Sequence, residues 1–198
     1  MKGHAPAAER NRTPILEALK PRLPETPGTL LEIASGTGQH AVYFASNLPG
    51  WKIQPTDKQP ESISSIDMWR EDEGAESVLP ALMLDVLAEP WPVESADAIF
   101  CANMIHISPW SCTEALFRGA ARLLKSGQKL FTYGPYLVDA RPTTNSNQAF
   151  DQDLRGRDPK WGLRDIAEVE GVAKGAGFTL KERLDMPAHN FFVVFERD

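Results

Sequence analysis

The stretch LLEIASGTGQHA, residues 30–41, is the most informative part of this chain. Two leucines, an acid and an isoleucine predict a buried strand, and Gly36 and Gly38 stand in a run of small residues that predicts a tight turn. Glycine suits such a turn because it lets the backbone bend and a ligand approach where a Cβ would clash. Residues 39–48 favour a helix, whose first N–H groups point towards anything bound at the turn. A strand, a glycine turn and a helix in this order open the nucleotide-binding half of a doubly wound sheet.

The glycine turn is compatible with two kinds of cofactor. Gly36, Gly38 and Ala41 match the loose dinucleotide fingerprint, with Asp57 near the spacing of a ribose-binding acid, which keeps an NAD(P)-dependent oxidoreductase open. Glu32 favours the other kind, because its charge is poorly placed beside a pyrophosphate and well placed beside a cation. S-adenosyl-L-methionine (SAM) carries an ammonium and a sulfonium, so the sequence favours SAM.

The same run resembles the first motif of class I SAM-dependent methyltransferases, acid-x-Gly-x-Gly-x-Gly. Ala34 stands in place of the first glycine, and we expect its methyl group to narrow the space at the methionine end. The resemblance implies that Ala34, Ser35, Gly36 and Gly38 surround the cofactor.

Acids end three successive predicted strands: Glu32, Asp57 and Asp85. Ligands of open α/β sheets bind outside the carboxyl ends of the strands, so we expect all three acids to line the cofactor site. Asp57 is expected to accept hydrogen bonds from the ribose hydroxyls, with a helix-cap or turn role as the alternative. In the methyltransferase pattern Asp85 receives the adenine amino group, and Val86 lies alongside.

The segment NMIHISPW, residues 103–110, follows the fourth predicted strand and is expected on the methyl-acceptor side of the site. Asn103 is the candidate cofactor contact in this loop. His106 is the candidate general base, and a packed loop residue is the alternative reading. Tyr136 is a second catalytic candidate that either orients the acceptor or packs, and Trp110 and Trp161 are candidates for an aromatic wall.

Residues 1–12 predict an N-terminal arm, because the polar run ERNR stands just before Thr13-Pro14. Threonine followed by proline is typical of a helix N-cap and first helical position, so the helix is expected to begin there. The arm is either a solvated leader or a lid over the cofactor mouth. In the second case Asn11 or Arg12 reaches the ligand or the Asn103 loop.

The remaining pattern predicts one α/β domain over residues 1–198, a Rossmann-like seven-stranded sheet with helices on both faces. The sheet is expected to be mostly parallel with an antiparallel last strand, because only a short connection joins the final two strands. Beyond the first strand, strands are predicted over residues 51–54, 78–84, 96–102, 129–133, 178–184 and 191–196, and helices over residues 61–69, 113–125, 148–157 and 166–175.

Composition narrows the function classes. Hydrophobic residues make up 42% and charged residues 24% of the 198 residues, which describes a globular protein. A net charge of −6 with scattered basic residues disfavours nucleic-acid binding and fits a small-molecule or protein acceptor. Cys101 and Cys112 predict reduced thiols in the cytoplasm and no metal site. No apolar run is long enough for a bilayer, and the N-terminus lacks the apolar centre of a signal peptide.

Several longer motifs together resemble one family, that of methyltransferase-like protein twenty-six and its bacterial relatives. These motifs are PAAERNRTPIL, LEIASGTGQHA, QPTD, FCANMIHISPW, YGPY, NSNQAFD and MPAHN, spread from Pro6 to Phe195. The family has no assigned function and carries a SAM-methyltransferase-type domain, so the resemblance implies a class I fold, SAM as cofactor and no particular acceptor. A SAM-dependent methyltransferase is the expectation, and a non-catalytic module that binds SAM or S-adenosylhomocysteine (SAH) within an assembly is the alternative.

Overall fold

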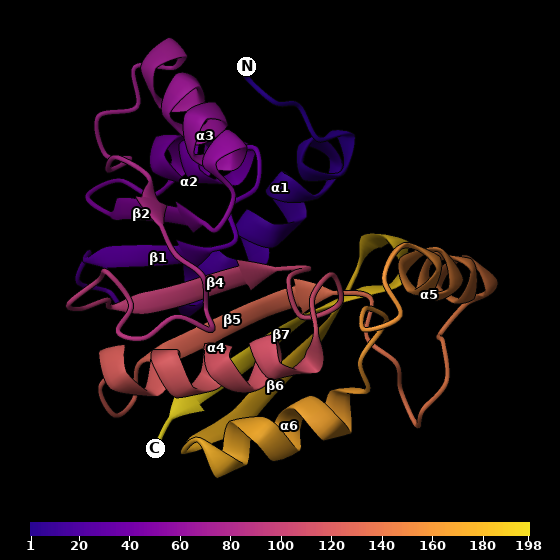
Figure 1. Ribbon diagram of the computed structural model, residues 1–198. Helices are drawn as coiled ribbons and strands as arrows, with labels where there is room; N and C mark the ends of the chain where they lie inside the picture. Colours follow the sequence, from indigo (N-terminus) through magenta and orange to yellow (C-terminus); the bar gives the residue numbers. More distant parts are fainter.

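A seven-stranded sheet runs through the centre of the computed structural model, which describes residues 1–198 (Figure 1). The strand order is β3-β2-β1-β4-β5-β7-β6, and β7 runs antiparallel to both of its neighbours while the other pairs are parallel. The strands are β1 (Thr29–Ile33), β2 (Lys52–Asp57), β3 (Leu82–Met83), β4 (Ala98–Ala102), β5 (Lys129–Gly134), β6 (Phe178–Met186) and β7 (Asn190–Arg197). The predicted mostly parallel sheet with an antiparallel last strand is confirmed.

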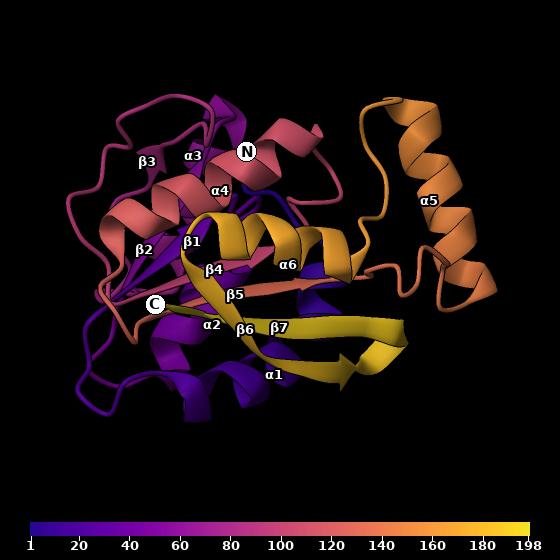
Figure 2. The same ribbon diagram turned by 90° about the horizontal axis from the view of Figure 1, so that it is seen from below.

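Helices cover both faces of the sheet, as predicted (Figures 1 and 2). Successive side chains of a strand point to opposite faces, so Leu30 packs with α1 and α2 while Leu31 packs with α4 and α6. The helices are α1 (Pro6–Leu19), α2 (Gln39–Asn47), α3 (Pro60–Asp72), α4 (Trp110–Leu123), α5 (Asn145–Arg157) and α6 (Ile166–Gly175), with short 3-10 turns at Lys20–Arg22 and Pro187–His189. None of these helices combines the length and apolar character that a membrane crossing needs.

The chain changes direction across the sheet between β1 and β4. The first three strands run outward on one side of β1, and β4 starts the other side. The carboxyl ends of β1 and β4 therefore diverge at this switch point, which is where open α/β sheets form their ligand crevice.

The first helix begins eight residues earlier than the Thr13-Pro14 motif predicts. It starts at Pro6 and continues through Pro14, which lies inside it. Proline removes one helical N–H, but contacts on both sides of it hold the helix. Asn11 bonds to His40 before it, and Ile15 is fully buried after it.

The third strand is much shorter than the predicted range 78–84. Leu82 and Met83 form the regular pairing with β2, whereas Val78 forms an isolated bridge with Ile53 of the same strand. Pro80 lies between the two pairings and has no N–H to donate, so the ladder is interrupted there.

Candidate functional site

The turn after β1 is formed by the residues that the sequence singles out. Ala34, Gly36 and Gly38 have positive φ angles of 56°, 58° and 94°. A Cβ on Gly38 would lie 2.7 Å from the Cα of Ile66 on α3, so glycine is needed for the turn to pack this closely.

Hydrogen bonds attach this turn to the end of β2. The Ser35 N–H donates to the Thr56 carbonyl at 2.8 Å, and the Ser35 Oγ accepts from the Thr56 N–H at 3.1 Å. The Gly36 N–H donates to Asp57 Oδ2 at 2.9 Å. The carboxylate at the end of β2 is therefore held in a fixed position relative to the turn after β1.

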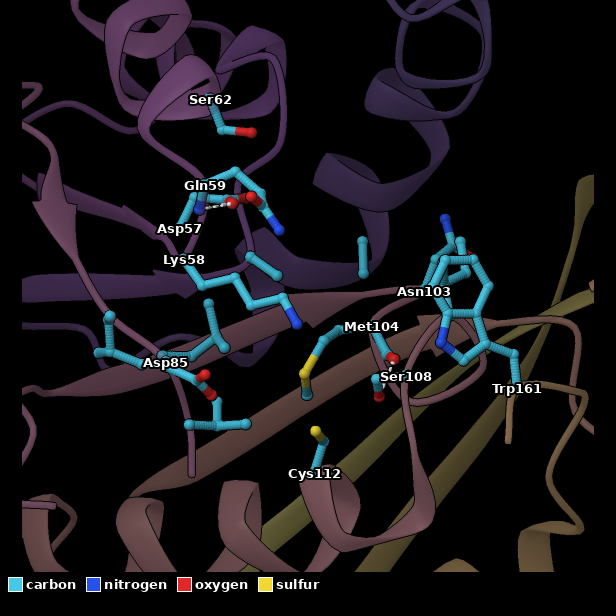
Figure 3. A pocket seen from close by; sticks show the side chains of 16 residues that line it. Asp57, Lys58, Gln59, Ser62, Asp85, Asn103, Met104, Ser108, Cys112 and Trp161 are labelled. Atoms are coloured by element: carbon cyan, nitrogen blue, oxygen red, sulfur yellow. Dashed lines mark hydrogen bonds between the residues drawn. The ribbon is translucent and has the colours of Figure 1, made fainter. Parts of the chain in front are cut away.

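A cavity of about 360 Å³ opens at this edge of the sheet (Figure 3). Side chains from four successive strand ends line it, together with Ser108, Cys112 and Trp161 from later segments. The strand-end residues include Ala34 after β1, Asp57 and Lys58 at β2, Asp85 and Val86 after β3, and Asn103 after β4.

Five of the nine predicted cofactor residues line this one cavity: Ala34, Asp57, Asp85, Val86 and Asn103. Three others, Ser35, Gly36 and Gly38, form the turn beside it, and Glu32 lies at the end of β1 below the turn. The sequence positions thus come together at one place in the fold.

The two lining carboxylates keep acceptor capacity. Asp57 Oδ1 accepts from the Gln59 N–H and Oδ2 from the Gly36 N–H, both at 2.9 Å, so Asp57 also has the turn role considered for it. Each oxygen retains a second lone pair. Asp85 Oδ1 accepts from the Leu87 N–H at 3.0 Å. Both acids lie at one end of the cavity, opposite Asn103 and Trp161 (Figure 3).

Glu32 is a buried carboxyl group with one unpartnered oxygen. Its Oε2 has no hydrogen bond, and its Oε1 lies 3.7 Å from His40 Nδ1. Burial is the main cause that raises the pKa of Glu32 to about 8; a Ser35 hydrogen bond opposes the rise and the charge of Asp57 adds to it. Burial also lowers the pKa of His40 to about 4, so the two groups are not an ion pair at neutral pH. The unpartnered Oε2 is buried beneath the turn, and Glu32 does not line the cavity.

Asn11 and Arg12 lie on α1 and do not line the cavity. Asn11 Oδ1 is 2.8 Å from His40 Nε2. Arg12 pairs with Glu9 at 2.5 Å and lies over the Tyr43 ring at 4.7 Å. Asn11 therefore reaches the turn region through His40, and Arg12 contacts the outer surface of α2.

Residues 1–5 are attached to α2 and α3. The Gly3 N–H donates to Ser65 Oγ at 2.7 Å, and the Trp69 indole N–H donates to the Gly3 carbonyl at 2.8 Å. The Ala5 N–H donates to Gln39 Oε1 at 2.6 Å. The arm thus lies against the helices that flank the glycine turn.

His106 and Tyr136 are both fully buried and neither lines the cavity. His106 Nδ1 accepts from the Arg164 backbone N–H at 3.3 Å, which leaves the ring proton on Nε2. Burial, assisted by the Arg164 charge, lowers the pKa of His106 to about 3. Tyr136 donates to Thr132 Oγ1 at 2.6 Å, and burial raises the pKa of its hydroxyl. The His106 backbone N–H donates to the Asn103 carbonyl at 3.0 Å, but neither candidate side chain reaches the cavity that the cofactor residues line.

Trp110 and Trp161 take different positions. Trp110 is the first residue of α4, lies under the Arg164 guanidinium at 5.6 Å, and belongs to a separate shallow depression with Glu168. Trp161 lines the cavity beside Asn103 (Figure 3).

Sequence reasoning missed four polar lining residues: Lys58, Gln59, Ser62 and Ser108. Lys58 and Gln59 directly follow Asp57, so the strand-end argument could have included them. Ser62 lies one helical turn further on, and Ser108 lies within the loop already assigned to the acceptor side. No group of three or more His, Cys, Asp or Glu side chains gathers as a metal site.

The site's donors and acceptors fit SAM. Asp57 and Asp85 offer acceptors for a ribose diol and an amino group, with apolar Val86 and Leu84 beside them. Glu32 supplies an unpartnered buried oxygen for a cation beside the turn. A pyrophosphate has no such cationic group, so Glu32 fits a dinucleotide less well.

The fold is similar to that of solved methyltransferases. An O-methyltransferase family protein from Burkholderia thailandensis superposes with a TM-score of 0.82 at 16% identity, over 97% of this chain and 57% of that chain. The SAM-dependent methyltransferase SibL in its apo form gives 0.78 at 20% identity, over 96% and 55%. PigF with SAH gives 0.75 at 16% identity, over 85% and 50%.

This chain spans about half the length of these solved proteins, and at such low identities the likeness shows a shared fold. A family model gives a closer relationship, because it matches residues 2–197. Its description is "Protein of unknown function (DUF938)", and the chain therefore belongs to the DUF938 family.

Proposed function

We propose that this chain is a SAM-dependent methyltransferase. The observation that carries the proposal is the cavity itself, which joins an acid after β2 and an acid after β3 to the glycine turn after β1. An oxidoreductase using NAD(P) is less well supported, because buried Glu32 lies beside that turn.

Each predicted cofactor residue takes a role that follows from its position. Asp57 accepts the ribose hydroxyls, and Asp85 with Val86 holds the adenine. Glu32 faces the cationic methionine end, where Ala34, Ser35, Gly36 and Gly38 provide backbone contacts. Asn103 contacts the cofactor on the side of β4.

Bound SAM supplies an electrophilic methyl group on sulfur, and the chain's contribution is placement. Asp57 and Asp85 fix the adenosine end, and Asn103 and Trp161 bound the opposite end, where water must be excluded. Correct alignment of two reactants provides much of the rate in such a displacement. His106 and Tyr136 contribute by packing under this end, since neither is open to the cavity.

We propose that residues 1–12 act as a lid, with Asn11 or Arg12 reaching the ligand side. The contact of Asn11 with His40, and of His40 with Glu32, supports a link between the arm and the methionine end. Because α1 starts at Pro6, deleting all twelve residues removes half of a helix, so limited proteolysis is the better test.

SAH is expected to slow tryptic cleavage at Arg10 and Arg12, because ligand contacts hold the arm in place. Cleavage at the control site Lys174 on α6, which does not contact the arm, should not change. Equal cleavage rates at Arg10 and Arg12 with and without SAH would identify the arm as a plain leader.

We also propose that the chain is related to methyltransferase-like protein twenty-six and its bacterial relatives, because the motifs quoted above resemble that family. We further propose a cytoplasmic location, supported by the two free and buried cysteines, and an acceptor that is a small molecule or an exposed protein group.

A non-catalytic SAM- or SAH-binding module is the second candidate, favoured by the burial of both His106 and Tyr136. Mass spectrometry distinguishes the two functions. The purified protein is incubated with SAM carrying a deuterated methyl group and with a metabolite extract. A labelled product that forms only with active protein supports the enzyme, whereas SAH binding without any labelled product supports the module.

A further inference from the structure

Lys58 is the only basic residue that lines the cavity, and its ammonium takes part in no hydrogen bond or ion pair of the structure. The side chain points into the middle of the cavity, towards Met104 (Figure 3). Burial raises the pKa of the Cys112 thiol on the facing helix α4, whereas a Ser108 hydrogen bond and the Lys58 charge oppose that rise. The positive charge of Lys58 therefore acts across the cavity.

Trp161 forms an aromatic wall at the Asn103 end of the same cavity (Figure 3). The Arg157 guanidinium already lies over this indole, 5.1 Å from the ring centroid. A ring that carries one cation is a poor site for a second, because the two cations repel each other. The wall therefore suits a neutral or anionic planar group, which stacks on an indole.

The segment that carries Trp161 is attached to the acceptor-side loop through His106. The Gly162 N–H donates to the His106 carbonyl at 2.9 Å, and the Arg164 N–H donates to His106 Nδ1 at 3.3 Å. The Arg164 guanidinium also donates to the Ser108 carbonyl at 2.8 Å. His106 is thus a positioning residue that fixes Trp161 relative to Asn103.

The cavity offers no free base to the acceptor. Asp57 and Asp85 lie at the adenosine end, and His106 is sealed from the cavity with its Nδ1 already occupied. An acceptor that must lose a proton early in the reaction needs such a base, whereas an acceptor that arrives ionised does not.

We propose that the methyl acceptor is a planar aromatic molecule bearing an ionised hydroxyl group, held between the Lys58 ammonium and the Trp161 indole. This inference rests on the proposed methyltransferase function. A lone pair of the phenolate oxygen forms the new O–CH₃ bond while the S–CH₃ bond breaks, and the electron pair of that bond stays on sulfur. The anion and the sulfonium both become neutral, so no proton needs to be removed at the site.

An amine acceptor fits these residues less well. An ammonium group has no lone pair, and Lys58 and Arg157 both repel it. Lysine beside a phenol instead stabilises the acceptor, because a nearby cation favours the ionised form of the hydroxyl group.

The test uses the full chain loaded with SAH and three probes that share a nitrobenzene ring. 4-Nitrophenol is ionised at a mildly alkaline pH, 4-nitroanisole is its neutral methyl ether, and 4-nitrobenzylamine is cationic. Calorimetry first measures SAH binding and then the binding of each probe. We expect the phenolate to bind about five-fold more tightly than the anisole, as a partly exposed ion pair allows, and the benzylammonium to bind most weakly.

Two pairs of variants separate charge from ring contact. Lys58→Met should bind the phenolate and the anisole with equal affinity, whereas Lys58→Arg should still bind the phenolate more tightly. Trp161→Leu should weaken the binding of the phenolate and of the anisole by the same factor, whereas Trp161→Phe should retain most of the affinity for both. The SAH affinity of each variant is measured in the same titration series.

The acceptor assignment is overturned if the phenolate binds no better than the anisole, or if Lys58→Met still prefers the phenolate. In either case, SAH binding by the chain leaves the proposed methyltransferase function in place. If the unmodified chain does not bind SAH, both the proposed function and this inference are overturned.

Discussion

At the scale of single residues, Glu32 combines a cost in stability with a proposed use in binding. The carboxyl group is 1% exposed, one of its oxygens is unpartnered, and its pKa is raised to about 8 by burial. The folded protein therefore keeps a proton that the unfolded chain releases near pH 4.5. Such a group lowers the stability of the fold as the pH rises towards its folded pKa.

The first prediction is a pH slope that disappears in Glu32→Gln. Above the unfolded pKa of His40 and His106, 6.5, both histidines are largely neutral in the folded and unfolded states, so up to the folded pKa of Glu32, about 8, Glu32 accounts for most of the difference in bound protons. Wild-type stability should fall by about 2 kcal/mol across this window. The glutamine variant has no such slope, and urea unfolding at several pH values measures both.

Two outcomes are informative about this residue. If the wild type and Glu32→Gln show parallel pH profiles, Glu32 is ionised in the free protein and the linkage is wrong. Glu32→Gln should also weaken SAH binding, because an amide cannot carry the negative charge proposed to attract the ligand's ammonium.

The second prediction concerns Asp57, which accepts from two backbone N–H groups and is proposed to accept from the ribose. Asp57→Ala should weaken SAH binding about ten-fold or more, because charge-assisted hydrogen bonds contribute roughly 1.5–3 kcal/mol each. Asp57→Asn is the matched control for shape, and calorimetry gives both dissociation constants. An unchanged SAH affinity in Asp57→Ala would reduce Asp57 to its turn role.

At the scale of elements, the connection between β1 and α2 depends on how closely the turn approaches α3. Gly36 and Gly38 both have positive φ, but only Gly38 lies against another backbone. The two glycines are thus a matched pair, in which one position tests conformation alone and the other tests conformation and packing together.

The third prediction is that Gly38→Ala destabilises the protein more than Gly36→Ala. At Gly36 the new methyl group meets nothing within 4 Å, so only the left-handed conformation is unfavourable, by about 1–2 kcal/mol. At Gly38 the methyl also approaches Ile66 Cα to 2.7 Å, and α2 or α3 must move, which adds about 1–3 kcal/mol. Denaturant unfolding compares the two, and equal losses would contradict the packing argument.

Elements differ in how well local sequence predicts them. The strand ends carrying Glu32 and Asp57 are visible because apolar runs stop at an acid. The short β3 was over-predicted because the apolar pattern of residues 78–84 hides the effect of Pro80 on pairing. The start of α1 was misplaced because Thr13-Pro14 is a good local N-cap signal, whereas tertiary contacts of Asn11 decide where the helix begins.

At the scale of the whole molecule, the pattern of connections predicts the order of the strands, but it does not predict which residues form the acceptor side of the cavity. Trp161 reaches the cavity from the connection between α5 and α6, and His106 is sealed by Arg164 from the same connection. These contacts join residues more than fifty positions apart. Residue type and spacing therefore predicted which strand-end residues gather at the cavity, and they named only a set of candidates for its far side.

The architecture also explains why the proposed cofactor residues gather at one cavity. The parallel strands β1, β2, β3 and β4 end at the same edge, and the switch between β1 and β4 opens that edge. A ligand bound there contacts all four strand ends at once, so cofactor identity is a property of the assembled sheet.

The most direct test of this account is calorimetric titration of the full chain with SAH and, separately, with NAD. The account predicts saturable SAH binding in the micromolar range and no measurable heat of binding for NAD, because Glu32, Asp57 and Asp85 together suit an adenosine linked to a cationic amino acid. Saturable NAD binding with no SAH binding would contradict it.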